Sequence, residues 1–443
     1  MRTVITFILA ILCSTSIALA DTYTGTTGDC TYTLDTDEGT LVISGTGAME
    51  DYEYYDEYSS SNAPWNNLYI KTVTIEDGVT SIGDYAFYFC ANLTSVTIGS
   101  GVTSIGEWAF SWCWSLKSVT FGDNSALTSI GSDAFYACTL TSITIPESVT
   151  NIGECAFRGC SSLTSITVSE GNTAYVSVDG VLYTYDMTTL VCYPAGKTDT
   201  SFIIPEGVTS IDLCAFDGCE SLTSVTISDS VTSIGDYAFQ ACTSLTSVTI
   251  GSGVTSIGEY AFCWCWSLKS VTFGDNSALT SIGSDAFYYC TSITSITIPE
   301  SVTSIGDYAF YWCSSLDSII SLNTTPPTIY SSTFSDQYET ATLYATSTDY
   351  ATADYWENFT NIVYDTSGNA ISSVAASTSA ISAIGNTIVI TTEAAQTAQV
   401  YSLAGQLIVK QAVSAGETSI DMPTGGVYIV ALADGTKAKV LVK

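Results

Sequence analysis

The chain has 443 residues, of which 46% are hydrophobic and only 12% are charged, so it can build a sizeable core and is not an acidic disordered chain. Its formal net charge of −34 excludes nucleic acid and anionic membranes as partners, because ten scattered Lys and Arg side chains cannot drive counterion release. The absence of histidine removes imidazole-based catalysis, the common histidine-containing zinc sites and the usual pH switch near neutrality.

The N-terminus has the three parts of a secretory signal peptide. Arg2 supplies the positive charge, residues 4–12 form an apolar stretch, and residues 18–20 read Ala-Leu-Ala, a small-residue cleavage motif. We therefore predict a signal peptide over residues 1–20. Cys13 does not follow a small residue, as a lipoprotein cysteine would, so simple cleavage is favoured over lipid attachment. No other apolar stretch in the sequence approaches the roughly 20 residues needed to span a bilayer.

A repeated motif dominates the middle of the chain. Nine units of 22 to 25 residues can be aligned, and they start at Val79, Val102, Leu127, Val149, Val208, Val231, Val254, Leu279 and Val302. Such a period predicts a solenoid in which each repeat packs only against its neighbours. Residues 172–207 form a degenerate unit, whose Asp179-Gly180 predicts a hairpin turn. Residues 79–139 recur almost unchanged as residues 231–291, a duplication that favours a multivalent binding surface over a unique catalytic site.

Each unit contains a strand pattern. In the first unit, Leu93, Val96 and Ile98 alternate with Ser95 and Thr97. Because side chains alternate across a strand, the apolar residues should point into the solenoid. The Ser and Thr residues should form a polar ladder on the outer face of a parallel sheet.

The other side of each unit carries a second apolar pair and a turn. Val79 and Ile82 should point inward, and Gly83 permits a tight turn. An acid then opens residues 84–90, which we predict to form a short helical segment, since the positive end of a helix favours an acid. Phe87 should lie in the core, where its burial would contribute roughly 1.5–3 kcal/mol.

Cysteines recur at one repeat position. We predict a buried ladder of small apolar side chains, and we do not expect disulfides along it, because parallel stacked side chains do not point at one another. A zinc site made only of cysteines is the alternative. Cys155 and Cys214 share a position usually held by Tyr or Trp, and the sequence does not pair Cys30 or Cys192. The ladder consists of Cys90, Cys113, Cys138, Cys160, Cys219, Cys242, Cys265, Cys290 and Cys313.

Acidic residues recur just after the turn glycine. They are interpreted as stabilising the start of the helical segment, and calcium bridging between rungs is the alternative. Acids repeated at one position give no unique carboxylate pair of the kind that a glycosidase requires, so we predict no catalytic residue, no metal site and no cofactor. The residues are Asp84, Glu107, Glu154, Asp236, Glu259 and Asp307.

Tyr and Trp gather near the turns and are the candidate ligand-binding residues. Exposed aromatic side chains are favoured in binding interfaces and can stack on sugar rings, whereas packing between successive coils is the alternative. The candidates are Tyr85, Trp108, Trp112, Trp114, Tyr237, Tyr260, Trp264, Trp266, Tyr308 and Trp312.

The unit over residues 79–98, Val-Thr-Ser-Ile-Gly-Asp-Tyr-Ala-Phe-x-x-Cys-x-x-Leu-Thr-Ser-Val-Thr-Ile, resembles the BspA-like (Treponema-pallidum-type) leucine-rich repeat. The resemblance covers residues 77–327 and implies a repeat solenoid with a parallel β ladder and short helical turns. It also implies a surface or secreted protein, of a kind often described as an adhesin. Residues 21–76 resemble the N-terminal cap of this family, and residues 328–365 should form the C-terminal cap.

The end of the chain has a different composition. Residues 366–380 are rich in Ser and Ala and predict a linker, and residues 381–443 break into short apolar runs typical of a small all-β domain. Within them, Gly425-Gly426-Val427-Tyr428 and the Lys-bounded final strand resemble the type A sorting domain of the type IX secretion system. This resemblance implies export across the outer membrane and surface attachment. The alternative is an ordinary immunoglobulin-like β-sandwich.

Taken together, the sequence predicts a secreted protein, either extracellular or attached to the outer-membrane surface, that binds and does not catalyse. Its expected partners are a protein or glycan on a host or partner-cell surface, bound in the manner of an adhesin, and the type IX secretion machinery. No nucleic acid and no transmembrane segment are expected. A structural coat or spacer component, without a discrete ligand, is the alternative.

Overall fold

The computed structural model describes residues 22–55, 60–66, 68–364, 380–384, 387–392, 395–402, 407–422, 426–432 and 437–442. The predicted signal peptide and nearly all of the predicted linker lie outside these residues. Contacts within the chain define two compact units. The first comprises Met1–Thr294, Ser301–Leu316 and Thr328–Asp336, and the second comprises Ser295–Glu300, Asp317–Pro327 and Gln337–Lys443.

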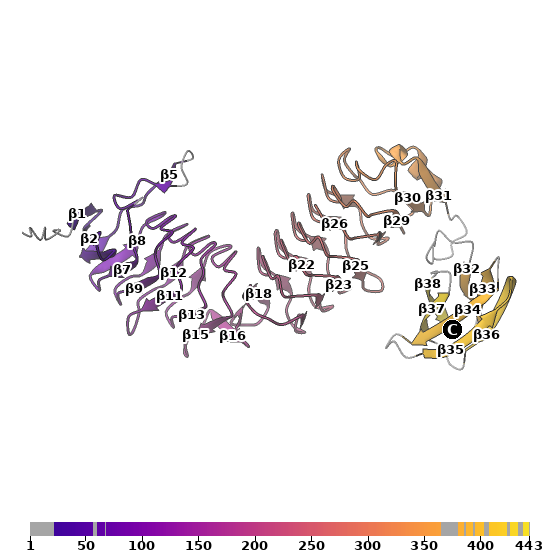
Figure 1. The fold of residues 1–443 in the computed structure, drawn as a ribbon, viewed down its shortest axis with the longest axis horizontal. Helices are drawn as coiled ribbons and strands as arrows, with labels where there is room; N and C mark the ends of the chain where they lie inside the picture. Colours follow the sequence, from indigo (N-terminus) through magenta and orange to yellow (C-terminus); the bar gives the residue numbers. More distant parts are fainter. Residues whose placement is uncertain are drawn as a thin grey trace, which may run out of the picture. The chain divides into compact units, whose positions relative to one another are not determined.

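The repeats of the first unit form a β-solenoid, as predicted, with two parallel ladders (Figure 1). In the first ladder, β9 (Ser95–Ile98) pairs in register with β7 (Thr72–Ile75) and β11 (Ser118–Phe121). In the second, β8 (Val79–Ile82) pairs with β10 (Ser104–Ile105). Each residue therefore lies beside its equivalent in the next rung, so one favourable side chain is repeated along the whole stack.

The same strands recur in later repeats, in separate sheets. Equivalent to the strands of the first ladder are a sheet of β13 (Ser142–Ile145) and β15 (Ser165–Val168) and a sheet of β19 (Ser201–Ile203), β21 (Ser224–Thr226), β23 (Ser247–Ile250) and β25 (Ser270–Phe273). The second ladder is extended by β12 (Ser129–Ile130) and β14 (Asn151–Ile152). Its later equivalents β20 (Ser210–Ile211), β22 (Ser233–Ile234), β24 (Ser256–Ile257), β26 (Ser281–Ile282) and β28 (Ser304–Ile305) lie in another sheet.

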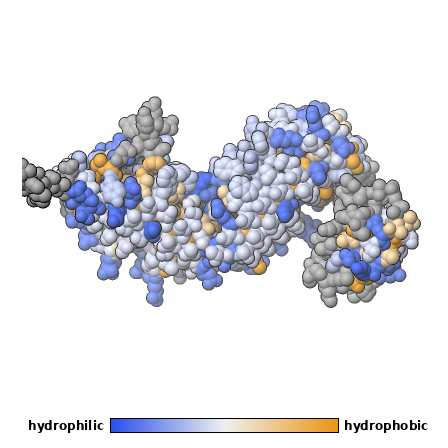
Figure 2. Space-filling model, viewed as in Figure 1, coloured by the Kyte–Doolittle hydropathy of each residue, from blue (hydrophilic) through white to orange (hydrophobic). Residues whose placement is uncertain are grey.

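The alternation predicted for the strands is confirmed. Val96 and Ile98 are buried, and Thr97 is exposed. On the side of the second ladder, the Thr103 hydroxyl donates to the carbonyl oxygen of Thr80 in the preceding rung at 2.8 Å, so the surface hydroxyls also join the rungs. On the face drawn in Figure 2 the repeats are mostly pale, as a surface of Ser, Thr, Gly, Tyr and Trp should be, and orange is confined to small spots.

Phenylalanine and cysteine ladders fill the core beneath the turns. Phe87 stacks on Phe110 with ring centroids 5.0 Å apart, and Phe110 stacks on Phe135 at 5.4 Å. The Cys113 thiol donates to the carbonyl oxygen of Phe87 at 3.2 Å, and the Cys138 thiol makes the same bond to Phe110 at 3.1 Å. The predicted cysteine ladder is thus confirmed, and from Cys113 onward each thiol of the ladder donates to a carbonyl of the preceding rung.

The turn segment over residues 84–90 is not helical, and the predicted short helical turn was wrong. Tyr85 and Phe89 have φ values of 50° and 58°, outside the right-handed helical region. Alternate amides point sideways: Phe87 N–H donates to the carbonyl oxygen of Ala109 in the next rung, whereas Tyr88 N–H bonds back to Tyr85. The segment forms hydrogen bonds to the next rung in place of helical ones, because the carbonyls of that rung, about 4.8 Å away, are within reach.

The acids after the turn glycine also act between rungs. Asp84 Oδ1 accepts a hydrogen bond from Glu107 N–H at 2.7 Å, and Asp236 Oδ1 accepts one from Glu259 N–H at 2.7 Å. Since no helix begins at Asp84 or Asp236, stabilisation of a helix start is not their role. At these two positions, the carboxylate joins neighbouring coils.

The N-terminal end of the solenoid is closed by a meander of β1 (Thr22–Thr27), β2 (Cys30–Asp35) and β3 (Thr40–Gly45), and β3 pairs parallel with β7. Trp65 is fully buried, stacks on Phe87 at 5.5 Å and donates its indole N–H to the carbonyl oxygen of Ala86 at 2.8 Å. This indole covers the end of the phenylalanine ladder. The smaller strands here are β4 (Gly47–Ala48), β5 (Tyr54–Tyr55) and β6 (Ser60–Ser61).

The degenerate unit keeps the stack continuous. It folds as β16 (Tyr175–Val178), β17 (Val181–Thr184) and β18 (Thr189–Cys192), antiparallel to one another, and the predicted hairpin turn joins the first two. β18 then pairs parallel with β20. Tyr193 stacks on Phe216 at 5.1 Å and so takes the place of the missing phenylalanine.

The second unit contains a parallel sheet of β27 (Ser295–Ile298), β29 (Ser318–Ser321), β30 (Thr342–Ala345) and β31 (Asn361–Tyr364), so part of the predicted C-terminal cap is built of ladder strands. Two 3₁₀ helices, η1 (Thr348–Ala351) and η2 (Trp356–Asn358), lie between β30 and β31. Trp356 is fully buried and donates its indole N–H to the carbonyl oxygen of Pro327 at 2.8 Å.

The C-terminal region is a small all-β fold, as predicted. Two antiparallel sheets, with strand orders β32-β33-β36 and β35-β34-β37-β38, bury apolar side chains such as Ile388, Val400 and Val430. The strands are β32 (Ala380–Ile384), β33 (Thr387–Thr392), β34 (Gln396–Ser402), β35 (Leu407–Val413), β36 (Gly416–Asp421), β37 (Gly426–Leu432) and β38 (Lys437–Val442). Within the described ranges, no helix is long and apolar enough to cross a membrane.

Candidate ligand-binding site

The turn segments carry most of the aromatic candidates, and we call the surface formed by residues 84–91 and their equivalents the turn face. Tyr85, Tyr237 and Tyr260 all have positive φ, but so do Asp133 and Cys155 at the same repeat position. The backbone therefore does not require an aromatic residue there. Among the candidates, Trp114, Trp264, Trp266, Tyr308 and Trp312 are 43–49% exposed, and the others are partly buried.

In the first cassette copy, residues 79–139, the aromatic side chains pack against one another. Tyr85 lies parallel to Trp108 at 6.2 Å, and Tyr88 meets the Tyr85 ring edge-on at 5.6 Å. Trp112 meets the rings of Trp114 and Tyr136 edge-on at 5.8 and 5.0 Å. Here the packing interpretation accounts for the four candidates Tyr85, Trp108, Trp112 and Trp114.

In the second cassette copy, residues 231–291, the turn face instead opens into a groove of about 480 Å³ that continues into the next unit. It is lined by Tyr237, Gln240, Tyr260, Cys263, Trp264, Asp285, Tyr288, Tyr308 and Tyr311, and we call it the aromatic groove. Of the ten candidates, the structure brings four together here: Tyr237, Tyr260, Trp264 and Tyr308. Trp266 and Trp312 are exposed but do not line the groove.

Smaller side chains stand at three turn positions of the second copy. Gln240 takes the repeat position of Tyr88, Ala241 that of Phe89 and Tyr260 that of Trp108, while Cys263 replaces Ser111. Tyr88 is buried, contacts the Tyr85 ring and lies 6.5 Å from that of Trp108, whereas Gln240 is a smaller side chain at the same place. A position-by-position comparison of the copies would have drawn attention to Gln240 before the structure was known.

The floor of the groove is fixed by polar contacts. Gln240 is 5% exposed, and its Oε1 accepts a hydrogen bond from Arg158 Nη2. The Gln240 side chain also bonds to the Cys263 thiol, whose pKa is raised to about 12, chiefly by burial. These contacts leave Gln240 held in place rather than free to turn toward a ligand.

A tyrosine–carboxylate pair lies in the wall of the groove. The Tyr260 hydroxyl donates a hydrogen bond to the Asp285 carboxylate. Burial and then the nearby Asp285 charge raise the pKa of Tyr260 to about 12, and burial is also the main cause of a raised pKa at Asp285. The groove therefore offers flat aromatic faces beside an acceptor of hydrogen bonds, and none of its lining residues is Lys or Arg.

Arg158 borders this groove and joins the repeats on either side of the degenerate unit. Its guanidinium lies between the rings of Tyr136 and Tyr237, 5.5 and 4.9 Å from their centroids, and its Nε is 3.5 Å from Asp217 Oδ2. Burial is the largest cause that raises the pKa of Asp217 to about 7, and Arg158 opposes this shift. The sequence did not indicate this cluster, because its members are far apart in the chain: Arg158 and Gln240 alone are 82 positions apart.

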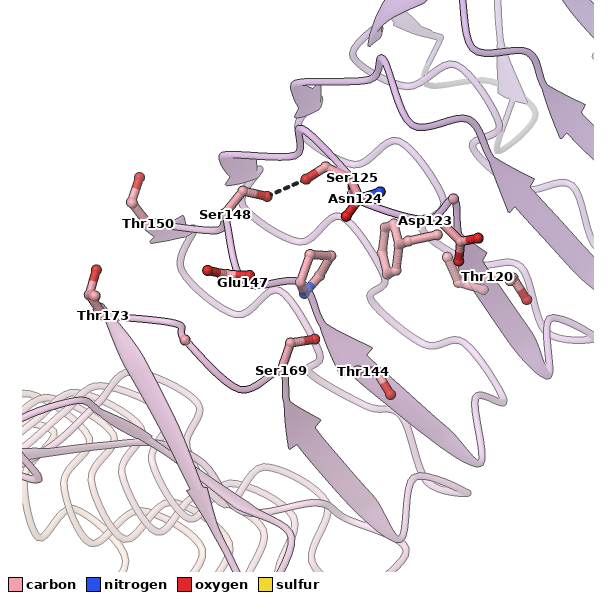
Figure 3. Close-up of a pocket in the computed structure, with 15 residues that line it drawn as sticks. Thr120, Asp123, Asn124, Ser125, Thr144, Glu147, Ser148, Thr150, Ser169 and Thr173 are labelled. Atoms are coloured by element: carbon pink, nitrogen blue, oxygen red, sulfur yellow. Dashed lines mark hydrogen bonds between the residues drawn. The ribbon is translucent and has the colours of Figure 1, made fainter.

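A second, polar pocket of about 940 Å³ lies where the longer repeat loop over residues 122–126 meets the next two rungs (Figure 3). Asp123, Asn124, Glu147 and Ser169 line it, and none of its lining residues is Tyr or Trp. The Ser148 hydroxyl, which donates to the carbonyl oxygens of Ser125 and Leu127 at 2.7 Å each, holds the loop in place. None of the ten sequence candidates contributes to this pocket.

Three cysteines of the ladder are poor metal ligands and nucleophiles. Burial raises the pKa of Cys90 to about 12 and also raises the pKa values of Cys113 and Cys290, which keeps these three thiols protonated. Among the described residues, no group of three or more Cys, Asp or Glu side chains could hold a metal ion. Cys155 and Cys214, outside the ladder, form a disulfide.

Comparison with known proteins identifies the repeat. A family profile described as "BspA type Leucine rich repeat region" matches in 6 copies, over residues 60–173, 195–317 and 280–388. None of the curated proteins compared with the chain matches it.

Solved structures of several bacterial repeat proteins are similar to the chain. A leucine rich cell surface protein from Faecalibacterium prausnitzii is 30% identical, with 68% of this chain and 95% of that one covered and a TM-score of 0.49. A leucine-rich repeat protein from Eubacterium ventriosum is 31% identical (70% and 97% covered, TM-score 0.45). The pneumococcal vaccine antigen PcpA is 19% identical (77% and 98% covered, TM-score 0.54), which shows a shared fold.

Proposed function

Because the chain belongs to the family of proteins with a BspA-type leucine-rich repeat region, we propose that it is a secreted or cell-surface binding protein. Its ligand is a protein or glycan on another cell or in a matrix, held on the turn face in the manner of an adhesin. The observation that carries this proposal is the aromatic groove, an open surface lined by five Tyr side chains and by Trp264, which is 46% exposed.

Surface location is supported from two sides. One similar solved structure is that of a cell surface protein. Residues 1–20 have the composition of a signal peptide, and residues 381–443 resemble a type IX sorting domain, whose partner would be the type IX secretion machinery. Expression with and without residues 381–443 in a bacterium that has this secretion system tests the assignment. The full chain should reach the cell surface, and the truncated chain should stay in the periplasm.

The binding role is tested with an array of matrix proteins and glycans, probed with the full-length protein in calcium and in chelator. Saturable binding to any component supports the proposal. If binding depends on calcium, that result would support calcium bridging between rungs by the acids of the turn. If nothing binds and the protein instead self-associates with rising concentration, the structural coat or spacer function replaces it.

A further inference from the structure

We propose that the aromatic groove binds a neutral oligosaccharide, through stacking on Trp264 and hydrogen bonding to Asp285 and to the tyrosine hydroxyls. This inference rests on the proposed binding function and names its ligand class.

An exposed aromatic face suits a sugar ring. A pyranose carries C–H bonds on its faces, which the negative face of an aromatic ring attracts. Trp264, which is 46% exposed, offers such a face and an indole N–H. Beside it, Tyr237 stacks on Tyr260 at 4.9 Å and Tyr288 stacks on Tyr311 at 5.9 Å, so these two pairs hold one another in place as the walls of the groove.

The polar groups suit hydroxyls. A carboxylate accepts several hydrogen bonds, and Asp285 already receives one from Tyr260, which orients it and leaves acceptor positions for ligand hydroxyls. Each tyrosine hydroxyl of the groove can donate and accept a hydrogen bond, so it can pair with a sugar hydroxyl as donor or as acceptor. Such a mixture of flat apolar faces and a few fixed polar groups is typical of small-ligand sites.

Charge selects against acidic sugars. The groove contains Asp285 but no Lys or Arg, and Glu259 and Asp307 also act on the Asp285 carboxyl. The whole chain carries a formal net charge of −34. A sialylated or sulfated glycan would therefore meet repulsion, whereas a neutral one would not. The bordering cation, Arg158, is already paired with Asp217 and hydrogen-bonded to Gln240.

Size favours a short oligosaccharide over a protein. The groove volume of about 480 Å³ lies in the range of small-ligand pockets. A stable protein partner would need a much larger surface, since such interfaces bury roughly 1,200–2,000 Å² in total. The lining residues come from four successive units, those that start at Val231, Val254, Leu279 and Val302, so the groove is about 14 Å long at 4.8 Å per rung. That length exceeds a single pyranose ring.

The duplicated cassette provides a matched control. Trp112 and Trp264 occupy the same repeat position in the two copies, but Trp112 packs between the rings of Trp114 and Tyr136 and does not line the groove. Removal of Trp112 should leave the groove intact.

The test titrates the full-length protein with neutral glucose, galactose and N-acetylglucosamine oligosaccharides, and with sialylated and sulfated oligosaccharides, by calorimetry. At least one neutral compound should bind saturably, about tenfold or more tighter than any acidic one. Trp264→Ala and Asp285→Asn should each weaken that binding about tenfold, and Trp112→Ala should leave it unchanged. Thermal unfolding confirms that each variant is folded.

Each other outcome overturns the inference in a distinguishable way. Binding to a matrix protein but to no oligosaccharide would remove the sugar ligand and keep the proposed function. Sugar binding that survives in Trp264→Ala and Asp285→Asn would place the site elsewhere. A preference for acidic glycans would contradict the charge argument. Absence of binding to proteins and sugars alike would remove both proposals.

Discussion

Cys155 and Cys214 are joined by a disulfide with their Cα atoms 5.5 Å apart, although 59 positions separate them in the chain. They lie on either side of the rung contributed by the degenerate unit. In that rung, two residues separate Leu190 from Tyr193. In the next rung, four residues separate the equivalent Ile211 and Phe216. The shorter turn leaves a gap in the turn face, and the two cysteines meet across it.

Removal of this disulfide should destabilise the solenoid at the degenerate unit. A cross-link over a loop of this length typically contributes roughly 2–4 kcal/mol, so the double variant Cys155→Ser/Cys214→Ser should unfold at lower urea concentration than the wild type. Reductant should lower the wild-type midpoint in the same way and leave that of the double variant unchanged. If reductant leaves the urea midpoint of the wild type unchanged, the Cys155–Cys214 disulfide does not form.

Asp217 should make stability depend on pH. Its folded pKa of about 7 lies above the ordinary aspartate value of 3.8, so between pH 4 and 7 the folded state holds a proton that the unfolded state has lost. Its contribution is therefore fully present below pH 4 and is lost as the pH rises through 7. Relative to wild type, Asp217→Asn should become progressively more stable from pH 4 to 8, as measured by urea unfolding. A constant difference across that range would contradict the shift.

The Cys113 and Cys290 thiols of the cysteine ladder should be unreactive in the folded protein. Both thiols are buried, both donate to backbone carbonyls, and burial raises the pKa of each. Labelling with a thiol reagent should be slow in buffer and rapid in urea. The sites are read by mass spectrometry, and rapid native labelling of Cys113 or Cys290 would show that the ladder is open to solvent.

Gln240→Tyr should close the aromatic groove. The new ring would restore the residue of the first copy, Tyr88, which packs against its neighbours. Oligosaccharide affinity should fall at least about tenfold, with the fold retained by circular dichroism. Cys263→Ser is the control, because it also restores the residue of the first copy, Ser111, but adds no volume. Unchanged binding in Gln240→Tyr would exclude the groove as the site.

Much of the fold follows from the sequence. The alternation of Leu93, Val96 and Ile98 with Ser95 and Thr97 fixes which side chains face the core, because a strand has a period of two. Repetition at 22 to 25 residues then stacks each position on its equivalent in the next rung, so the phenylalanine and cysteine ladders follow without further information. Trp264 and Tyr308, which the structure shows to be exposed, could be named as candidates because the repeat also fixes which Tyr and Trp residues fall in the turns.

The remaining features depend on contacts between rungs, which no single repeat encodes. Residues 84–90 form turns rather than a helix because the next rung supplies carbonyls to Tyr85 and Phe87. The Cys155–Cys214 pair exists because an intervening turn is short. Equivalent turn positions line a groove only in the second copy, where Gln240 is smaller than the Tyr88 that packs on its neighbours in the first. The sequence determined each residue's place within its coil, and the tertiary structure decided its neighbours in the adjacent coils.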